Sequence, residues 1–171
     1  FSLGSGGATN QSSQTFVGWA WKAGGSASSN SSGTISSSVS ANTKAGFSMV
    51  SYTGLGSGNA GATVGHGLGG VPELMIVKDR GQSDHWWIYH HHANGVNSSD
   101  PETDYFVLSG SGARADNNNA WYDTAPTSTV FTIGANGWTN SAQPYIAYLF
   151  RSIEGYSKVS AYTGFDNVEG P

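Results

Sequence analysis

The stretch Gly46 to Gly54, GFSMVSYTG, decides how this chain is interpreted, because it occurs twice. Residues Gly155 to Gly164 read GYSKVSAYTG, which repeats the glycine, aromatic, serine, valine and Tyr-Thr-Gly positions in order, with one residue inserted. A second pair of copies joins FVGWAWK, from Phe16 to Lys22, with YIAYLFR, from Tyr145 to Arg151. Self-similarity over such a distance is typical of arrays of domains.

Composition and charge exclude several classes of function. The chain has 171 residues, of which 37% are hydrophobic, 12% aromatic and 11% charged, and its formal net charge is -4. This is enough apolar material for one sandwich-sized core. The seven cations are scattered, so we expect no nucleic-acid partner. No apolar run reaches the length of a membrane-spanning helix, so we expect no membrane insertion either.

Short strands separated by turn residues predict an all-β chain. No stretch shows helical periodicity, so we expect no helix. We predict an antiparallel β-sandwich, jelly-roll-like, with an extended N-terminal arm and orphan strands at both ends. The run Leu74 to Val77, LMIV, does not alternate, which predicts burial on both faces. The expected strands are 16–22, 47–52, 63–66, 73–78, 85–91, 105–109, 121–122, 129–133, 145–151 and 156–163.

The repeats also predict the division of the chain. Residues 1–45 are expected to form an N-terminal arm, an orphan strand at 16–22 and a Ser/Gly-rich linker, in which 33–40 is the one candidate edge strand. Residues 46–154 form the sandwich, and 155–171 open an incomplete following repeat. Either the chain is a piece of a longer array, or copies of the chain supply the missing partners.

The second alternative makes the orphan strands an assembly surface, because unpaired apolar strands associate. A head-to-tail strand exchange does not close on itself and produces an open filament. The expected assembly residues are Phe16, Val17, Trp19 and Trp21 on the first orphan strand, and Tyr156, Val159 and Tyr162 on the second.

Metal binding and catalysis lack a specific pattern. The histidines near residue 90 include a same-face pair but no accompanying regular acids, so we expect no metal and no cofactor; His66 and His90 are the only candidates. The carboxylates show no paired arrangement of the glycosidase type. No Gly-x-Ser-x-Gly elbow occurs either, so we expect no enzyme.

Carbohydrate binding is the rival function. Trp138, next to an Asn-Gly turn, is the best candidate for an exposed stacking ring, with Trp121 and Asn118 as further candidates. Tryptophans in strands also suit the core of a sandwich. Three sequons, at Asn10, Asn30 and Asn97, mark surface glycosylation if the host performs that chemistry.

Longer motifs run through most of the chain, from about Phe16 to Gly164. They are FVGWAWKAGG, the run Val39 to Ser48, SYTG, TVGHGLGGVPELMIVK, IYH and YIAYLF followed by Glu-Gly-Tyr-Ser-Lys. These segments resemble an uncharacterised domain that recurs, often in tandem, in fibre-like proteins of marine phages and cyanophages. The resemblance implies a β-sandwich in a virion or extracellular fibre and brings no catalytic residues; His66 and His90 match recurrent positions of that family.

We therefore expect a structural protein of an extracellular or virion-associated fibre. It would polymerise head-to-tail by β-strand complementation, with copies of itself as partners. The alternative is a glycan-binding receptor-recognition module of a phage tail or capsid fibre, with surface glycans as partners.

Overall fold

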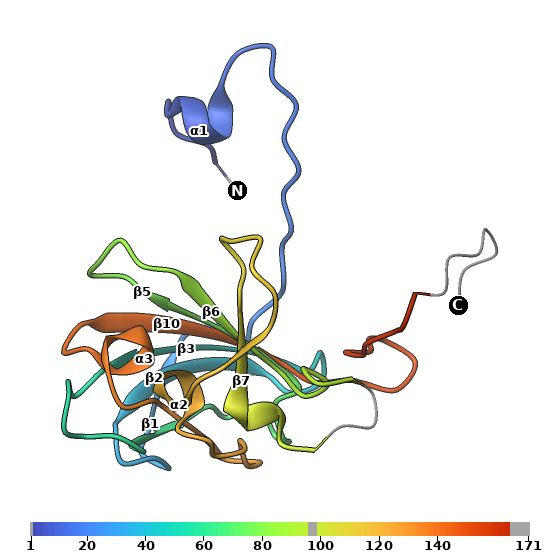
Figure 1. The fold of residues 1–171 in the computed structure, drawn as a ribbon. Helices are drawn as coiled ribbons and strands as arrows, with labels where there is room; N and C mark the ends of the chain where they lie inside the picture. Colours follow the sequence, from blue (N-terminus) through green and yellow to red (C-terminus); the bar gives the residue numbers. More distant parts are fainter. Residues whose placement is uncertain (1, 96–98, 165–171) are drawn as a thin grey trace.

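The fold is an antiparallel all-β sandwich, which confirms the predicted class. The computed structural model describes residues 2–95 and 99–164. Within them, ten strands form two sheets, and every pair of strands is antiparallel (Figure 1). The strands are β1 (Ser28–Asn30), β2 (Ser37–Asn42), β3 (Phe47–Thr53), β4 (Thr63–Gly65), β5 (Leu74–Asp79), β6 (Trp86–His90), β7 (Asp104–Val107), β8 (Ala115–Asp116), β9 (Val130–Thr132) and β10 (Pro144–Phe150). The helices are α1 (Gly7–Asn10), α2 (Asn118–Trp121), α3 (Gly137–Asn140) and the 3-10 turn η1 (Pro101–Thr103).

The two layers are unequal in size. Eight strands form the large sheet in the order β1-β2-β3-β10-β5-β6-β7-β8, while β4 and β9 pair in the small one. At the centre, β3 and β10 pair over seven residues, from Phe47 opposite Phe150 to Thr53 opposite Pro144. The two strands whose sequences recur near the chain ends are therefore direct neighbours in the sheet.

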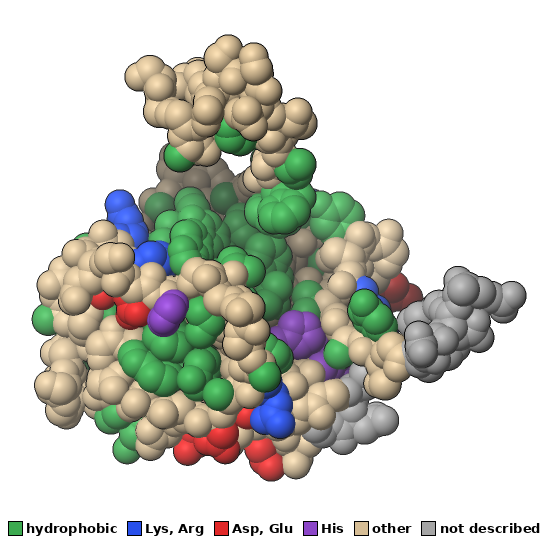
Figure 2. All heavy atoms as spheres, turned by 45° about the horizontal axis from the view of Figure 1, so that its top comes forward, with side chains coloured by type: hydrophobic (Ala, Val, Ile, Leu, Met, Phe, Trp, Pro, Cys, Tyr) green, Lys and Arg blue, Asp and Glu red, His purple; other side chains and the backbone are tan. Residues whose placement is uncertain are grey.

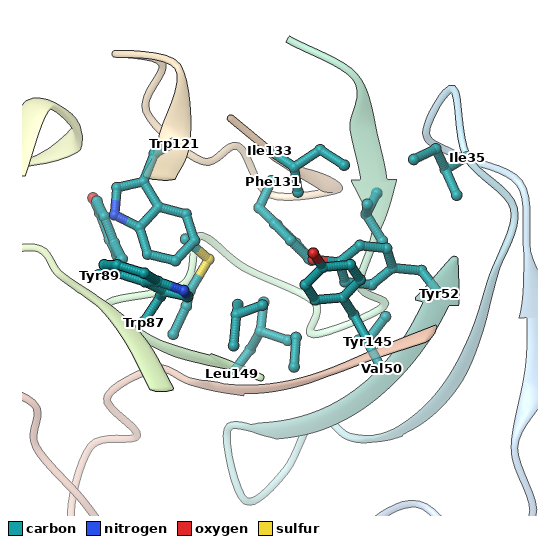
Figure 3. Close-up of a cluster of buried hydrophobic side chains, with 14 of the residues drawn as sticks. Ile35, Val50, Tyr52, Trp87, Tyr89, Trp121, Phe131, Ile133, Tyr145 and Leu149 are labelled. Atoms are coloured by element: carbon teal, nitrogen blue, oxygen red, sulfur yellow. The ribbon is translucent and has the colours of Figure 1, made fainter. Parts of the chain in front are cut away.

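Alternation along β10 separates the core from the outer face. Tyr145, Ala147 and Leu149 are fully buried on the inner face, as the period of two of a strand requires. The rings of Tyr52 and Tyr145 stack with centroids 5.0 Å apart, and Phe131 packs edge-on against Tyr52 from the opposite layer (Figure 3). Burial raises the pKa of Tyr145 to about 12, so its hydroxyl stays protonated in the core.

A buried asparagine joins two loops over the inner face, the β3–β4 connection and the β9–α3 connection. Asn140 accepts a hydrogen bond from the backbone N of Leu55 at 2.8 Å through Oδ1. Its Nδ2 donates to the carbonyls of Asn59 at 3.0 Å and Gly134 at 3.1 Å. Because every polar atom of this side chain is paired, the amide can be fully buried without penalty.

The Ser/Gly-rich segment corrects the prediction of a linker over 24–45, although the one candidate edge strand named there, 33–40, overlaps β2. β1 and β2 pair with each other, and β2 pairs with β3, so this segment extends the large sheet. Ser37 Oγ donates to Gly65 O and Ser40 Oγ donates to Gly25 O, both at 2.7 Å, which lets these serines be buried. A Cβ on Gly24 would lie 2.0 Å from Ala41 O. The small residues therefore serve close packing rather than flexibility.

Both terminal segments depart from the strands predicted for them. Residues 14–24 and 158–164 belong to no strand, and the N-terminal segment extends away from the body, with α1 near its far end (Figure 1). A strand needs a partner to satisfy its backbone groups, and these segments have no ladder with the described residues.

Short helices correct two further predictions. The strand expected at 121–122 is the end of α2, because Asn117 caps that helix by accepting from Asn119 N. Asn136 caps α3 in the same way. Four-residue helices are too short for periodicity to reveal them. No helix among the described residues has the length and hydropathy needed to cross a membrane.

Candidate assembly surface

The N-terminal segment 16–22 presents apolar side chains to solvent. Val17 and Trp19 are each 81% exposed, Trp21 is 57% exposed and Phe16 is 48% exposed. Single exposed apolar residues are ordinary, but several in one short segment mark an interaction surface. These are the assembly residues expected from the sequence.

Trp21 anchors the base of this segment on the outer face of the large sheet. Its ring stacks on Phe47 with centroids 6.2 Å apart and meets Phe150 edge-on at 5.5 Å. The side chain of Asn42 donates to Lys22 O at 3.1 Å just beyond it. The segment is therefore held where it leaves the sheet, at the end where β3 begins and β10 finishes.

The glycine that begins the C-terminal segment has a positive φ, like the glycine it copies. Gly46, which precedes β3, has φ 65°, and its copy Gly155 has φ 72°. Both values lie in the left-handed region that favours glycine. Beyond Gly155, Tyr156 and Tyr162 are 71% and 80% exposed, while Val159 is half-buried.

Two side chains hold the C-terminal segment against the body. His91 Nε2 donates to Val159 O at 3.1 Å, and Val159 N donates to Ser152 Oγ at 3.0 Å. Ser152 is itself fixed, because its backbone N donates to Glu73 Oε2 at 2.6 Å. Val159 therefore has both backbone groups paired, although it lies in no strand.

The bases of the two terminal segments line one groove. This groove has a volume of about 510 Å³ and lies over the first residue of β3 and the last residue of β10. Its lining includes Trp21, Lys22, Phe47, Phe150, Tyr156 and Lys158. Both candidate assembly segments therefore leave the subunit at one corner of the large sheet.

The outer face of the large sheet is apolar near this corner. Met49, Tyr148, Ile76 and Ile88 lie opposite one another across β3, β10, β5 and β6, and Phe106 of β7 continues the row. All five side chains are half-buried. Figure 2 shows hydrophobic side chains gathered beneath the N-terminal arm.

This apolar row continues under the arm as a groove. Its volume is about 530 Å³, and the arm contributes Trp19, Trp21 and Ala23 to its lining. Sequence reasoning did not predict this surface; the signal for it was apolar residues at both parities of β5, β6 and β10. The groove joins the arm to the sheet, so we include it in the candidate assembly surface.

His66 and His90, the two candidate metal ligands, make local hydrogen bonds. His66 is fully buried: its Nδ1 accepts from Leu68 N at 3.1 Å, so Nε2 carries the proton and donates to Thr127 O at 3.2 Å. Burial lowers the pKa of His66 from its usual 6.5. Burial, with His91 and His92 nearby, also lowers the pKa of half-buried His90. In the part of the chain that the structure describes, no three His, Cys, Asp or Glu side chains are grouped to hold a metal ion.

Of the two tryptophans proposed for glycan stacking, Trp121 is buried in the core, while Trp138 is half-buried and packs against the core. Trp121 is 1% exposed, and its Nε1 donates to Asp104 O at 3.1 Å. Trp138 stacks on Trp87 with centroids 4.1 Å apart, which covers one face of its ring. Asn118 is exposed at the first position of α2. Trp121 is therefore closed to a sugar ring, and Trp138 has one ring face covered by Trp87.

Two of the three sequons lie within the residues that the structure describes. Asn10 is exposed at the end of α1, where its Nδ2 donates to Gly4 O at 2.7 Å. Asn30 is half-buried, and its amide lies where a Cβ on Gly65 would clash, which disfavours a bulky modification there. Asn97 lies outside the described residues.

Comparison with known proteins gives a family and no relative of known structure. The model of a family described as a domain of unknown function, DUF7483, matches residues 1–171. Searches of curated proteins and of solved structures found no match.

Proposed function

The chain belongs to the DUF7483 family, and we propose that this member is the structural subunit of an extracellular or virion-associated fibre. Its subunits polymerise head-to-tail by β-strand complementation. The copies of β3 and β10 near the chain ends supply the strands that join one subunit to the next.

One observation carries this proposal. The two central neighbouring strands of the sheet, β3 and β10, each have a sequence copy that lies outside every strand. The copies keep the apolar pattern of a buried strand, yet Trp19 and Tyr162 are 81% and 80% exposed. A strand-like segment with an apolar face and no ladder is a template for pairing with another chain.

The location outside the cell rests on composition. The chain is rich in small polar and aromatic residues, and only 11% of its residues are charged. Immunogold labelling of a producing culture tests this directly. Label on fibres or virions supports the location, and label confined to the cytoplasm contradicts it.

Electron microscopy and sedimentation of the purified chain test polymerisation. We expect filaments from the full chain and a soluble monomer after deletion of residues 1–22. Deletion of residues 1–15 is the matched control, because it removes α1 but keeps the copy of β10; it should still polymerise. Filaments from the 1–22 deletion would show that the N-terminal copy plays no part in the joint.

A further inference from the structure

We propose that each joint reproduces the β3–β10 pair in trans, with residues 155–160 of one copy antiparallel to residues 17–22 of the next. This inference rests on the proposed function, and it names the partner, the direction and the register of the contact. The partner of each terminal segment is the other terminal segment of a second copy of this chain.

The template for the joint is inside the subunit. In the β3–β10 pair, Phe47 lies opposite Phe150, and two residues further along Met49 lies opposite Tyr148. The pair begins where Arg151 N donates to Gly46 O at 2.9 Å. Register in a sheet is fixed by which residues share a face, so a sequence copy with the same alternation favours the same register.

Transferring this register needs only the two sequence alignments. Residues 16–22 match 145–151 one for one, and residues 155–160 match 46–51 one for one. The resulting cross-subunit pairs are Lys22 with Gly155, Trp21 with Tyr156, Ala20 with Ser157, Trp19 with Lys158, Gly18 with Val159 and Val17 with Ser160.

The side chains brought together by this register are compatible. Trp21 meets Tyr156 where the template has two phenylalanines, and aromatic cross-strand pairs are favourable. Trp19 meets Lys158, a cation beside the best aromatic acceptor for one. Neither segment contains proline, so every residue of both can donate to a ladder.

The inserted residue Ala161 fits the template as a bulge. Two residues of a bulged strand lie opposite one residue of its partner, so Ala161 can be accommodated without shifting the following pair. Tyr162 then lies opposite Phe16, as Tyr52 lies opposite Tyr145 in the core. This assigns a partner to the two remaining aromatic assembly residues.

The geometry favours a second copy over pairing within one chain. Trp21 and Tyr156 line the same groove in one subunit, yet the segments beyond them form no ladder with each other. In the single subunit, the backbone of Val159 is bonded to His91 and Ser152, and Ser157 forms a bridge with Ile153. These contacts hold the C-terminal segment in a resting position, and they must be released before it pairs with a second copy. The N-terminal segment projects from the body, where a neighbouring subunit can reach it (Figure 1).

Disulfide trapping between singly substituted chains tests the register. The chain has no cysteine, so every crosslink comes from the introduced pair. Val17→Cys and Ala20→Cys are each mixed with Ser160→Cys and with Ser157→Cys, with different tags on the two chains. Ladder partners lie about 5 Å apart between Cα atoms, within disulfide range, while a displacement of three residues adds about 10 Å.

We expect the pairs Val17→Cys with Ser160→Cys and Ala20→Cys with Ser157→Cys to crosslink at least tenfold more than the two crossed pairs. Filaments in which the crossed pairs link instead overturn the register and leave the fibre function standing. A monomer in which the double variant Val17→Cys/Ser160→Cys links only within its own chain overturns both. Reduction of the trapped filaments should restore the subunits, which separates trapping from misfolding.

Discussion

Truncation of Trp19 should weaken assembly far more than it weakens the fold. The side chain is 81% exposed in the subunit, so Trp19→Ala removes few internal contacts. Surface substitutions of this kind usually change the free energy of unfolding by less than about 0.5 kcal/mol. The monomer should therefore unfold at nearly the same temperature as the unsubstituted chain.

The free energy of association that Trp19→Ala removes from the joint follows from the same exposed fraction. A tryptophan side chain buries about 200 Å² when covered. With 81% of Trp19 exposed, full burial at a joint removes about 160 Å² from water, worth up to about 4 kcal/mol at 25 cal/mol per Å². At 1.4 kcal/mol per tenfold, the critical concentration for polymerisation should rise by up to about a thousandfold.

Sedimentation across a protein dilution series measures this critical concentration, and thermal unfolding of the dilute monomer measures stability. Leu55→Ala is the matched control, since Leu55 is an exposed apolar residue, 48% accessible, outside both terminal segments. It should leave polymerisation unchanged. If Trp19→Ala shifted the critical concentration no more than the control does, Trp19 would not be buried at a joint.

Three further substitutions test other parts of the structure. His91→Ala should free the segment that His91 holds through Val159 O and shorten the lag of polymerisation followed by light scattering, whereas His92→Ala, which leaves that bond in place, should not. Asn140→Ala should lower the free energy of unfolding by about 3 kcal/mol and the melting temperature by about 10 °C in calorimetry, because it leaves Leu55 N, Asn59 O and Gly134 O without this partner; a change below 1 kcal/mol would contradict this. The folded chain holds His66 neutral with a pKa below 6.5, so the unfolded state binds more protons and stability should fall as the pH drops from about 6.5 toward that lowered value. His66→Asn should reduce the difference in unfolding free energy between pH 5 and pH 7.5, measured by denaturant titration at each pH. If that difference were unchanged, the pH dependence would belong to another group.

Sequence reasoning found the fold class because the strands alternate clearly. β10 is the plainest case, with Tyr145, Ala147 and Leu149 buried in turn. The non-alternating run in β5 also carried real information. Its inner residues are buried, as predicted. Leu74 and Ile76 on the apolar outer face are half-buried, so the predicted burial on both faces is complete on the inner face and partial on the outer one.

The linker prediction failed because composition does not report hydrogen bonding. A serine-rich segment is polar by count, yet Ser37 and Ser40 are buried once their hydroxyls donate to backbone carbonyls. Similarly, Gly33 adjoins Thr63 O so closely that a Cβ would lie 2.3 Å away. Contacts of this kind depend on segments far away in the chain, and no local window of sequence contains them.

The candidate assembly surface could likewise be predicted from the sequence only in part. Repetition in the sequence identified the exposed terminal segments, because a copied pattern is visible without any structure. It could not show that β3 and β10 are neighbours, nor that their copies leave the subunit at one corner. Trp121 and Trp138 were ambiguous between core and surface, and only packing against Asp104 and Trp87 decides that question.

The half-buried row from Met49 to Phe106 has a consequence for how the protein responds to its surroundings. Contacts made by such an apolar face are driven by water release, which weakens on cooling. Excluded salts such as sulfate strengthen the same contacts. Because only 11% of the residues carry charge, repulsion between neighbouring molecules is modest. If copies meet through this face, we expect their contact to respond to temperature and salt type more than to ionic strength, and cold, sulfate-free buffer should keep the molecules best dispersed.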